Sequence, residues 1–157
     1  MKVSVGLPTH RVDQPAEFVT AAAIADIAGA AEDAGFDAVF VTDHPFPADD
    51  WLAHGGHHAL DPLVALSFAA AATNTLRLHT NLFVLAYRNP FVSAKGIATL
   101  DALCDGRVIL GVGSGYLDAE FAALGVAFDE RNELTDEAIV MLRVSTTRTS
   151  TRRRRDG

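Results

Sequence analysis

A chain of 157 residues, 49% of them hydrophobic, is long and apolar enough to form one globular domain with its own core. No apolar run approaches the ~18 residues that a membrane span requires, and the start, MKVSVGLPTHR, lacks the apolar stretch of an export signal. We therefore expect a cytoplasmic protein with no membrane partner. The single cysteine, Cys104, excludes an internal disulfide, and the net charge of -7 argues against binding to nucleic-acid phosphates.

Short apolar runs alternate along the chain with alanine-rich helical stretches. The apolar runs predict strands over 3–7, 38–42, 76–85 and 107–112. The helical stretches cover 15–34, 62–72, 90–103, 118–124 and 135–143. Asp61-Pro62 and Asn89-Pro90 have the cap-plus-proline pattern that begins a helix, and Asp13 is the candidate cap of the first helix.

This alternation predicts an α/β fold with parallel strands and right-handed crossovers. Two architectures fit the pattern: an open doubly wound sheet, or part of a (β/α)8 barrel. In both architectures, ligands bind at the carboxyl ends of the strands. The sequence therefore directs the search for a site to the residues that follow each strand.

Asp43 and His44 stand directly after the second predicted strand, at the start of a loop over 43–60. This loop is much longer than the usual connection of about 2–6 residues, which favours a functional or a disordered segment. A neutral imidazole at this place could act as a base or donate to a substrate oxygen. The alternative is that His44 only packs at the strand end.

The run GVGSGYLD after the fourth strand contains three alternating glycines. It differs from the dinucleotide fingerprint, because the third glycine comes one position early and the run does not follow the first strand. The glycines either allow a tight turn, or expose backbone N–H groups of Ser114 and Gly115 to a flat ring or a phosphate. Trp51 and Tyr116 could stack on a planar cofactor.

Three histidines of the long loop, His54, His57 and His58, resemble a metal-binding cluster at first sight. No acid or cysteine lies beside them at ligand spacing, so we expect no metal site there.

The composition changes sharply at Val144. From there to Gly157 the chain reads VSTTRTSTRRRRDG, with five arginines and no apolar periodicity. We expect residues 144–157 to form a disordered tail. The abrupt change also suggests a frameshifted or truncated reading frame.

The stretches VFVTDH, TNLFVLAYRNP and DALCDGRVILGVGSGYLDAEFAALGVAFDER together resemble the luciferase-like monooxygenase superfamily, and most closely the class that uses the deazaflavin coenzyme F420. The resemblance covers residues 1–143. It implies a TIM-barrel (β/α)8 fold, of which this chain holds about the first four βα units. Members bind F420 or FMN at the carboxyl face of the barrel.

The resemblance also implies roles for individual residues. His44 matches the active-site histidine beside the reactive ring. A non-prolyl cis peptide is expected at Asn81-Leu82, in a bulge toward that ring. The expected cofactor-binding residues are Asp43, Asn81, Leu82, Ser114, Gly115 and Tyr116.

The implied activity is hydride transfer between a small organic substrate and F420. The alternatives are an FMN-dependent monooxygenase and a truncated, non-catalytic fragment. Members that oxidise sugar phosphates have a glutamate where this chain has Tyr116, which argues against that substrate class. Four parallel strands would leave two open sheet edges, and these edges are candidates for contacts within a homodimer.

Overall fold

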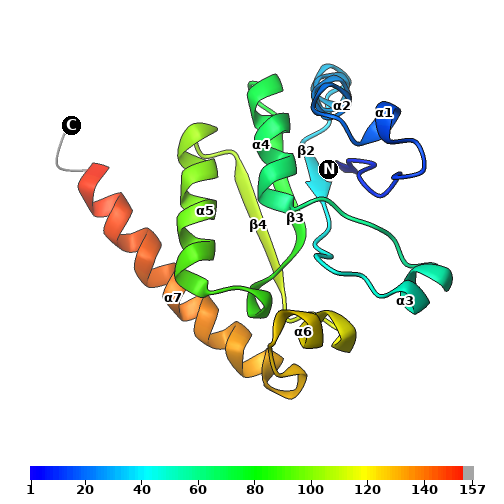
Figure 1. The fold of residues 1–157 in the computed structure, drawn as a ribbon. Helices are drawn as coiled ribbons and strands as arrows, with labels where there is room; N and C mark the ends of the chain where they lie inside the picture. The colour runs from blue at the N-terminus through cyan, green and yellow to red at the C-terminus, as the bar shows by residue number, and fades with distance from the viewer. Residues whose placement is uncertain (154–157) are drawn as a thin grey trace.

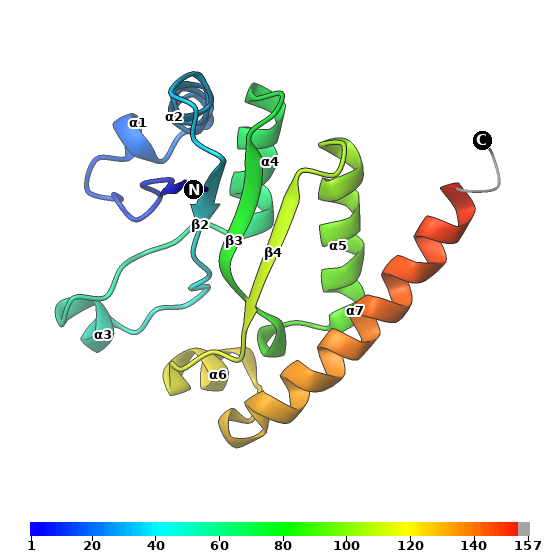
Figure 2. The same ribbon diagram turned by 180° about the vertical axis from the view of Figure 1, so that it is seen from behind.

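The computed structural model describes residues 1–153, with side chains up to Arg143. Four strands form one parallel sheet in the order β1 (Ser4–Gly6), β2 (Ala38–Val41), β3 (Arg77–Val84) and β4 (Val108–Gly113). The register places Ser4 opposite Ala38, and Leu78 opposite Val108. Helices cover one face of this sheet (Figure 1), whereas β3 and β4 lie uncovered in the view from behind (Figure 2). This one-sided arrangement is that of a barrel wall seen from outside and inside.

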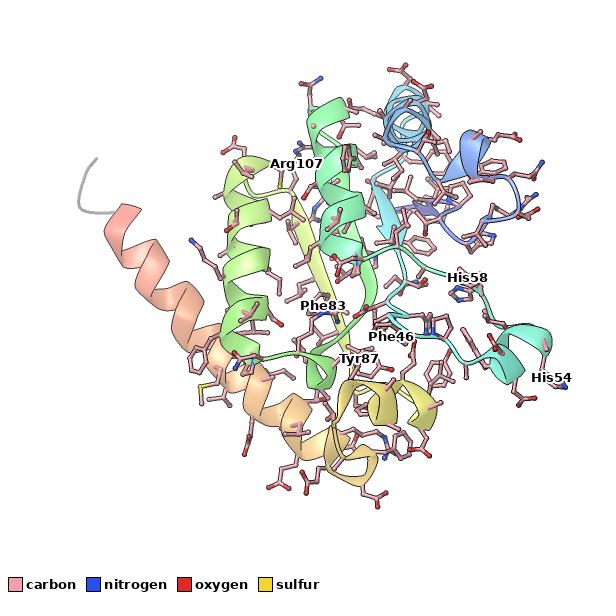
Figure 3. The ribbon with its side chains drawn as sticks, viewed as in Figure 1. Phe46, His54, His58, Phe83, Tyr87 and Arg107 are labelled. Carbon is pink, nitrogen blue, oxygen red and sulfur yellow. The ribbon has the colours of Figure 1, made fainter. Side chains whose placement is uncertain are left out.

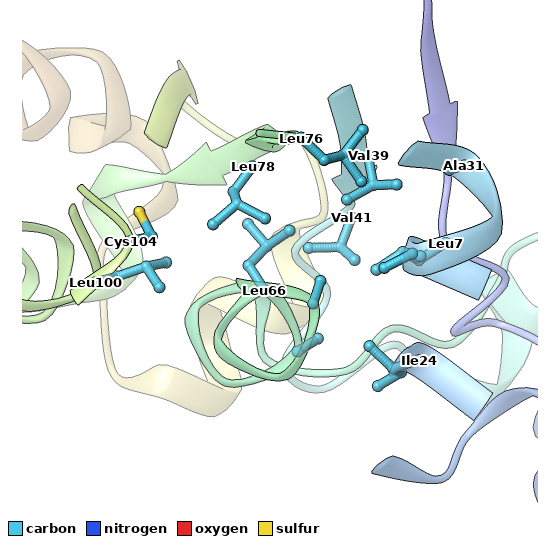
Figure 4. Packing of buried hydrophobic residues seen from close by; sticks show 13 residues of the cluster. Leu7, Ile24, Ala31, Val39, Val41, Leu66, Leu76, Leu78, Leu100 and Cys104 are labelled. Atoms are coloured by element: carbon cyan, nitrogen blue, oxygen red, sulfur yellow. The ribbon is translucent and has the colours of Figure 1, made fainter. Parts of the chain in front are cut away.

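The main core lies between the sheet and three helices, α2 (Ala21–Asp33), α4 (Pro62–Ala72) and α5 (Pro90–Leu103). Alternate strand residues such as Val39, Val41 and Leu78 point toward these helices and are completely buried or nearly so. Alanines on α2 and α4 let the helices approach the sheet closely. Figure 4 shows this cluster, which comprises Leu7, Ile24, Ala28, Ala31, Val39, Val41, Ala65, Leu66, Ala69, Leu76, Leu78, Leu100 and Cys104.

The first helical stretch differs from the prediction of one helix over 15–34. It consists of α1 (Pro15–Phe18) and α2, separated at residues 19–20. Thr20 is extended, and its hydroxyl accepts a hydrogen bond from the backbone N–H of Ala23, so it caps a new helix instead of continuing the old one. The predicted cap Asp13 instead pairs with Arg11.

The two cap-plus-proline starts are confirmed. The carboxylate of Asp61 accepts hydrogen bonds from two backbone N–H groups in the first turn of α4, and the side chain of Asn89 does the same for α5. The loop over 43–60 contains one short helix, α3 (Asp49–Ala53), and a 3-10 turn, η1 (Leu85–Tyr87), follows β3. The predicted short helix α6 (Asp118–Leu124) ends at Gly125, whose positive φ of 70° suits glycine.

The last helix, α7 (Arg131–Arg153), follows a second 3-10 turn, η2 (Phe128–Glu130), and is longer than predicted at both ends. The backbone of residues 144–153 is helical where we expected a disordered tail. Residues 131–153 contain neither glycine nor proline, and each added residue extends an existing helix by one hydrogen bond. Residues 154–157, the end of the predicted tail, lie outside the described residues. Within residues 1–153, no helix combines the length and the apolar character needed to cross a membrane.

Candidate functional site

The predicted site residues come together at one edge of the sheet. Because the four strands are parallel and adjacent, their carboxyl ends all point the same way. This edge holds His44 after β2, the Asn81-Leu82 bulge of β3 and Ser114 after β4. In Figure 1 it faces α3 and α6.

Asp43 is buried, and its carboxylate is fully engaged by the protein. Two guanidinium nitrogens of Arg88 donate to its two oxygens at 2.6 and 2.8 Å, and the backbone N–H of Val84 donates at 3.0 Å. Burial acts to lower the pKa of Arg88, but the hydrogen bond and charge of Asp43 outweigh it and raise that pKa above its ordinary value. Asp43 therefore ties the end of β2 to the segment after β3. Its predicted contact with a coenzyme stays a prediction.

His44 lies beside a buried carboxylate that the sequence analysis did not select. Its Nδ1 is 3.3 Å from Oε2 of Glu120, a residue of α6 with no exposed surface. The hydroxyl of Tyr87 donates to the same oxygen at 2.7 Å, and the backbone N–H of Phe46 donates to Oε1 at 3.3 Å. Figure 3 shows Phe46 and Tyr87 lying close to α6. One buried acid thus holds the loop after β2, the turn after β3 and the helix after β4 together.

Aromatic rings surround the imidazole of His44. The ring centroids of Trp51, His57 and Tyr116 lie 4.6, 4.9 and 6.0 Å from that of His44. Of the three loop histidines, His57 belongs to this ring cluster. In the part of the chain that the structure describes, no group of three or more histidines, cysteines and acids is arranged to hold a metal ion.

The expected cis peptide is present between Asn81 and Leu82, where the pairing of β3 with β4 shifts register. Gly111 lies opposite this bulge, and a Cβ there would come within 2.4 Å of the backbone oxygen of Thr80. A Cβ on Gly113 would lie 2.8 Å from a methyl carbon of Leu82. These two glycines of GVGSG therefore make room for the bulge of the neighbouring strand. The side chain of Leu82 is 47% exposed on the uncovered face.

The loop after β4 contains the other predicted residues. Gly115 has a φ of 80°, and a Cβ there would meet Val84 and Phe121 at 2.9 Å, so both conformation and packing require glycine. Ser114 is half-buried, and Tyr116 is exposed beside the ring cluster. Cofactor contacts of this loop stay predictions.

A hollow of about 260 Å³ opens at the carboxyl ends of β1 and β2. His57 borders this hollow and also contacts the ring of His44, so the hollow adjoins the candidate catalytic residue. Its lining combines apolar and hydrogen-bonding groups: Gly6, Leu7, Thr9, His10, Phe40, Val41, Thr42 and His57. Its size is close to the lower end of the range typical of small-molecule sites.

Three residues of the site, Tyr87, Arg88 and Glu120, were missed by the sequence analysis. Each had a detectable signal. Glu120 is an acid among apolar residues in DAEFAAL, and Tyr87-Arg88 are polar residues between an apolar strand and a helix start. Such patterns do not say which distant side chain will be the partner.

A family model described as "Luciferase-like monooxygenase" matches residues 1–154. The chain belongs to this family. A curated relative, the F420-dependent glucose-6-phosphate dehydrogenase of Kineococcus radiotolerans, is 41% identical over 111 residues, which are 70% of this chain and 32% of the relative. The sequence resemblance to luciferase-like proteins is thus confirmed.

Solved structures similar to this chain confirm the fold class. The monooxygenase RslO1 of Streptomyces bottropensis matches 91% of this chain and 42% of its own, with a TM-score of 0.73 and 28% identity. The F420-dependent tetrahydromethanopterin reductase of Methanopyrus kandleri matches 81% of this chain and 30% of its own, with a TM-score of 0.58 and 26% identity. This luciferase-like chain therefore has the α/β fold of part of a TIM barrel, and it spans about a third of the length of the curated relative above.

Proposed function

We propose that this luciferase-like chain provides one side of the active site of an F420-dependent oxidoreductase, which transfers a hydride between a small organic substrate and the coenzyme. The supporting observation is the placement of His44 at the carboxyl edge of the sheet, between the buried Glu120 and a cluster of rings. The curated relative from Kineococcus uses F420, and its identity to this chain is higher than that of the RslO1 monooxygenase.

The uncovered face of the sheet suits a flat, largely apolar ring. Leu82 packs over Gly111 and Gly113, and its exposed side chain offers an apolar surface on this face. Tyr116, also exposed, adds an aromatic surface at the same edge. A bound deazaflavin would accept or donate a hydride at its ring.

The protein's own groups would bind the ring, orient the substrate and move a proton. We assign ring contacts to Asn81, Leu82 and the backbone of Ser114 and Gly115. Through its Nε2, His44 would accept the proton of a substrate hydroxyl, or donate a proton to a substrate carbonyl oxygen in the reverse direction, since Nδ1 faces Glu120. Trp51 and His57 would limit the access of water to that imidazole.

The substrate would enter the hollow that Thr9, His10 and His57 border. This lining offers hydroxyl and imidazole groups, which suits an alcohol or a carbonyl compound. The glutamate of sugar-phosphate-oxidising members is replaced by Tyr116, so we propose a small organic alcohol or carbonyl compound other than a sugar phosphate. Glucose 6-phosphate is still the first comparison substrate, because the Kineococcus relative acts on it.

A titration of the chain with F420 and, separately, with FMN tests the proposal through the fluorescence of either ring. We expect saturable binding of F420 that is tighter than binding of FMN. Preference for FMN would support the monooxygenase alternative, to which the likeness to RslO1 points. Binding of F420 without turnover of any alcohol would identify a non-catalytic fragment, and binding of neither ring would overturn the proposal.

A further inference from the structure

We propose that Glu120 is a positioning residue for His44: its buried carboxylate fixes the imidazole with the proton on Nδ1 and leaves Nε2 as the nitrogen available to a substrate. This inference rests on the proposed role of His44 in proton transfer. The residue concerned lies on α6, more than seventy positions away in the chain.

The hydrogen-bond directions around Glu120 determine this tautomer. Two of its three partners donate to it: the backbone N–H of Phe46 cannot accept, and the hydroxyl of Tyr87, 2.7 Å from Oε2, faces a carboxylate oxygen that has no proton to give. Burial and then the hydrogen bond to Glu120 raise the pKa of Tyr87, so its hydroxyl keeps its proton. A carboxylate only accepts, and Nδ1 of His44 must then donate.

The contacts around His44 also oppose a change of its tautomer and a rotation of its ring. Glu120 is fully buried, and a buried carboxylate is costly unless its oxygens are satisfied by donors. If Nδ1 lost its proton, two unshared electron pairs would face each other 3.3 Å apart. Rotation of the imidazole is limited by the rings of Trp51 and His57, at 4.6 and 4.9 Å.

Asp43 reinforces this placement from the neighbouring position. Its ion pair with Arg88 fixes the backbone immediately before His44, while Tyr87, the residue before Arg88, donates to Glu120. Asp43 is thus held directly by Arg88. His44, the next residue, is held through Glu120 together with Tyr87, the residue before Arg88.

The test needs no cofactor, so its outcome is independent of the F420 titration. The ¹⁵N shifts of the His44 ring are recorded by long-range ¹H–¹⁵N NMR across a pH series, with the signal assigned from a His44→Gln variant. For the neutral ring we expect the Nδ1–H tautomer. The Nε2–H tautomer, or an equal mixture of the two, would overturn the proposal even if no variant of Glu120 folds.

A charge-removing variant provides the second readout. In Glu120→Gln the preference for the Nδ1–H tautomer of His44 should weaken, since an amide in place of the carboxylate can donate as well as accept. The ionisable groups that face the ring are Glu120 from α6, His57 from the long loop and Tyr116 from the loop after β4. An unchanged tautomer preference in a folded Glu120→Gln protein would contradict the proposal.

Asp118→Asn is the matched control, because Asp118 is an exposed acid on the same helix. It should leave the tautomer of His44 as in the parent chain. An equal change of tautomer in both variants would mean that His44 responds to general charge and not to the contact with Glu120, which would also refute the assignment.

Discussion

Asp43 and Arg88 form a two-pronged ion pair that joins the end of β2 to the segment after β3. The side chain of Asp43 is 1% exposed and that of Arg88 is 23% exposed, so water screens this pair little. The guanidinium also lies over the ring of Phe83, 4.5 Å from its centroid. The pair places His44, the next residue, beside Glu120.

Removing the cation from this pair should destabilise the fold strongly. Arg88→Met leaves Asp43 buried without its charged partner, and we expect a loss of about 3 kcal/mol in the free energy of unfolding. Urea unfolding followed by circular dichroism measures it. The control is Arg11→Met, which breaks the exposed pair with Asp13 and should have little effect on stability, because water screens that pair. Similar losses in the free energy of unfolding for the two variants would show that the buried Asp43–Arg88 pair stabilises the fold no more than an exposed pair does.

Glu32 should make stability depend on acidic pH. Its carboxylate accepts hydrogen bonds from the backbone N–H and the hydroxyl of Thr75, and from the N–H groups of Asn74 and Leu76. The Thr75 contacts contribute most to lowering its pKa from 4.5 to about 2. A lowered folded-state pKa stabilises the protein above 4.5, and this stabilisation is lost as the pH falls from 4.5 toward 2.

Glu32→Gln should therefore reduce stability at neutral pH by about 1 kcal/mol, a value limited by the solvent exposure of this carboxylate. The difference in the free energy of unfolding between variant and parent should shrink as the pH falls from 4.5 toward 2. Urea unfolding at neutral and acidic pH checks this. Asp33→Asn, at the exposed neighbouring acid, should show no such convergence. A constant difference at every pH would contradict the role of the charge.

The two glycines of β4 should differ in their tolerance of a methyl group. A Cβ on Gly111 would meet the backbone oxygen of Thr80, which cannot move without disrupting the strand, whereas one on Gly113 would meet only the flexible tip of Leu82. Gly111→Ala should cost about 2–3 kcal/mol and Gly113→Ala less than about 1 kcal/mol. Thermal melts of both variants decide the order, and a larger loss for Gly113→Ala would refute it.

The exposed side chain of Leu82 should contribute to coenzyme binding without contributing to folding. Leu82→Asp should weaken F420 binding by about tenfold, since it places a charge where an apolar ring would lie. Leu103→Asp, at a side chain that is 80% exposed at the end of α5, should leave binding unchanged. Fluorescence titration measures both, and equal affinities for the two variants would remove Leu82 from the site.

We predict self-association through the open sheet edge at β4 and the uncovered face beside it. Among the described residues, β1 and β4 each pair along one side only, and Ile109 of β4 alternates with Val108, which packs against the core, so Ile109 lies on the uncovered face. Sedimentation velocity should show a dimer that Ile109→Asp weakens, whereas Leu103→Asp does not. A monomer at all concentrations would contradict this prediction.

Most of the fold was predictable from local patterns. Buried parallel strands are apolar on both faces, and the caps at Asp61 and Asn89 satisfy backbone groups in the next turn, so neighbouring residues alone contain the signal. The prediction failed where a competing local choice existed. Thr20 divided the first helix because its hydroxyl can cap a new one, and α7 continued through a polar segment because nothing in it stops a helix.

The sequence by itself determined which residues stand at the strand ends, and hence that His44, Asn81 and Ser114 share one edge of the sheet. Only the tertiary structure decided the partners of those residues: Glu120 for His44, Arg88 for Asp43, and the Asn81-Leu82 bulge for the glycines of β4. The reason is physical. Strand and helix signals depend on residues a few positions apart, whereas a buried charge must find its partner among side chains that the fold brings together from distant positions.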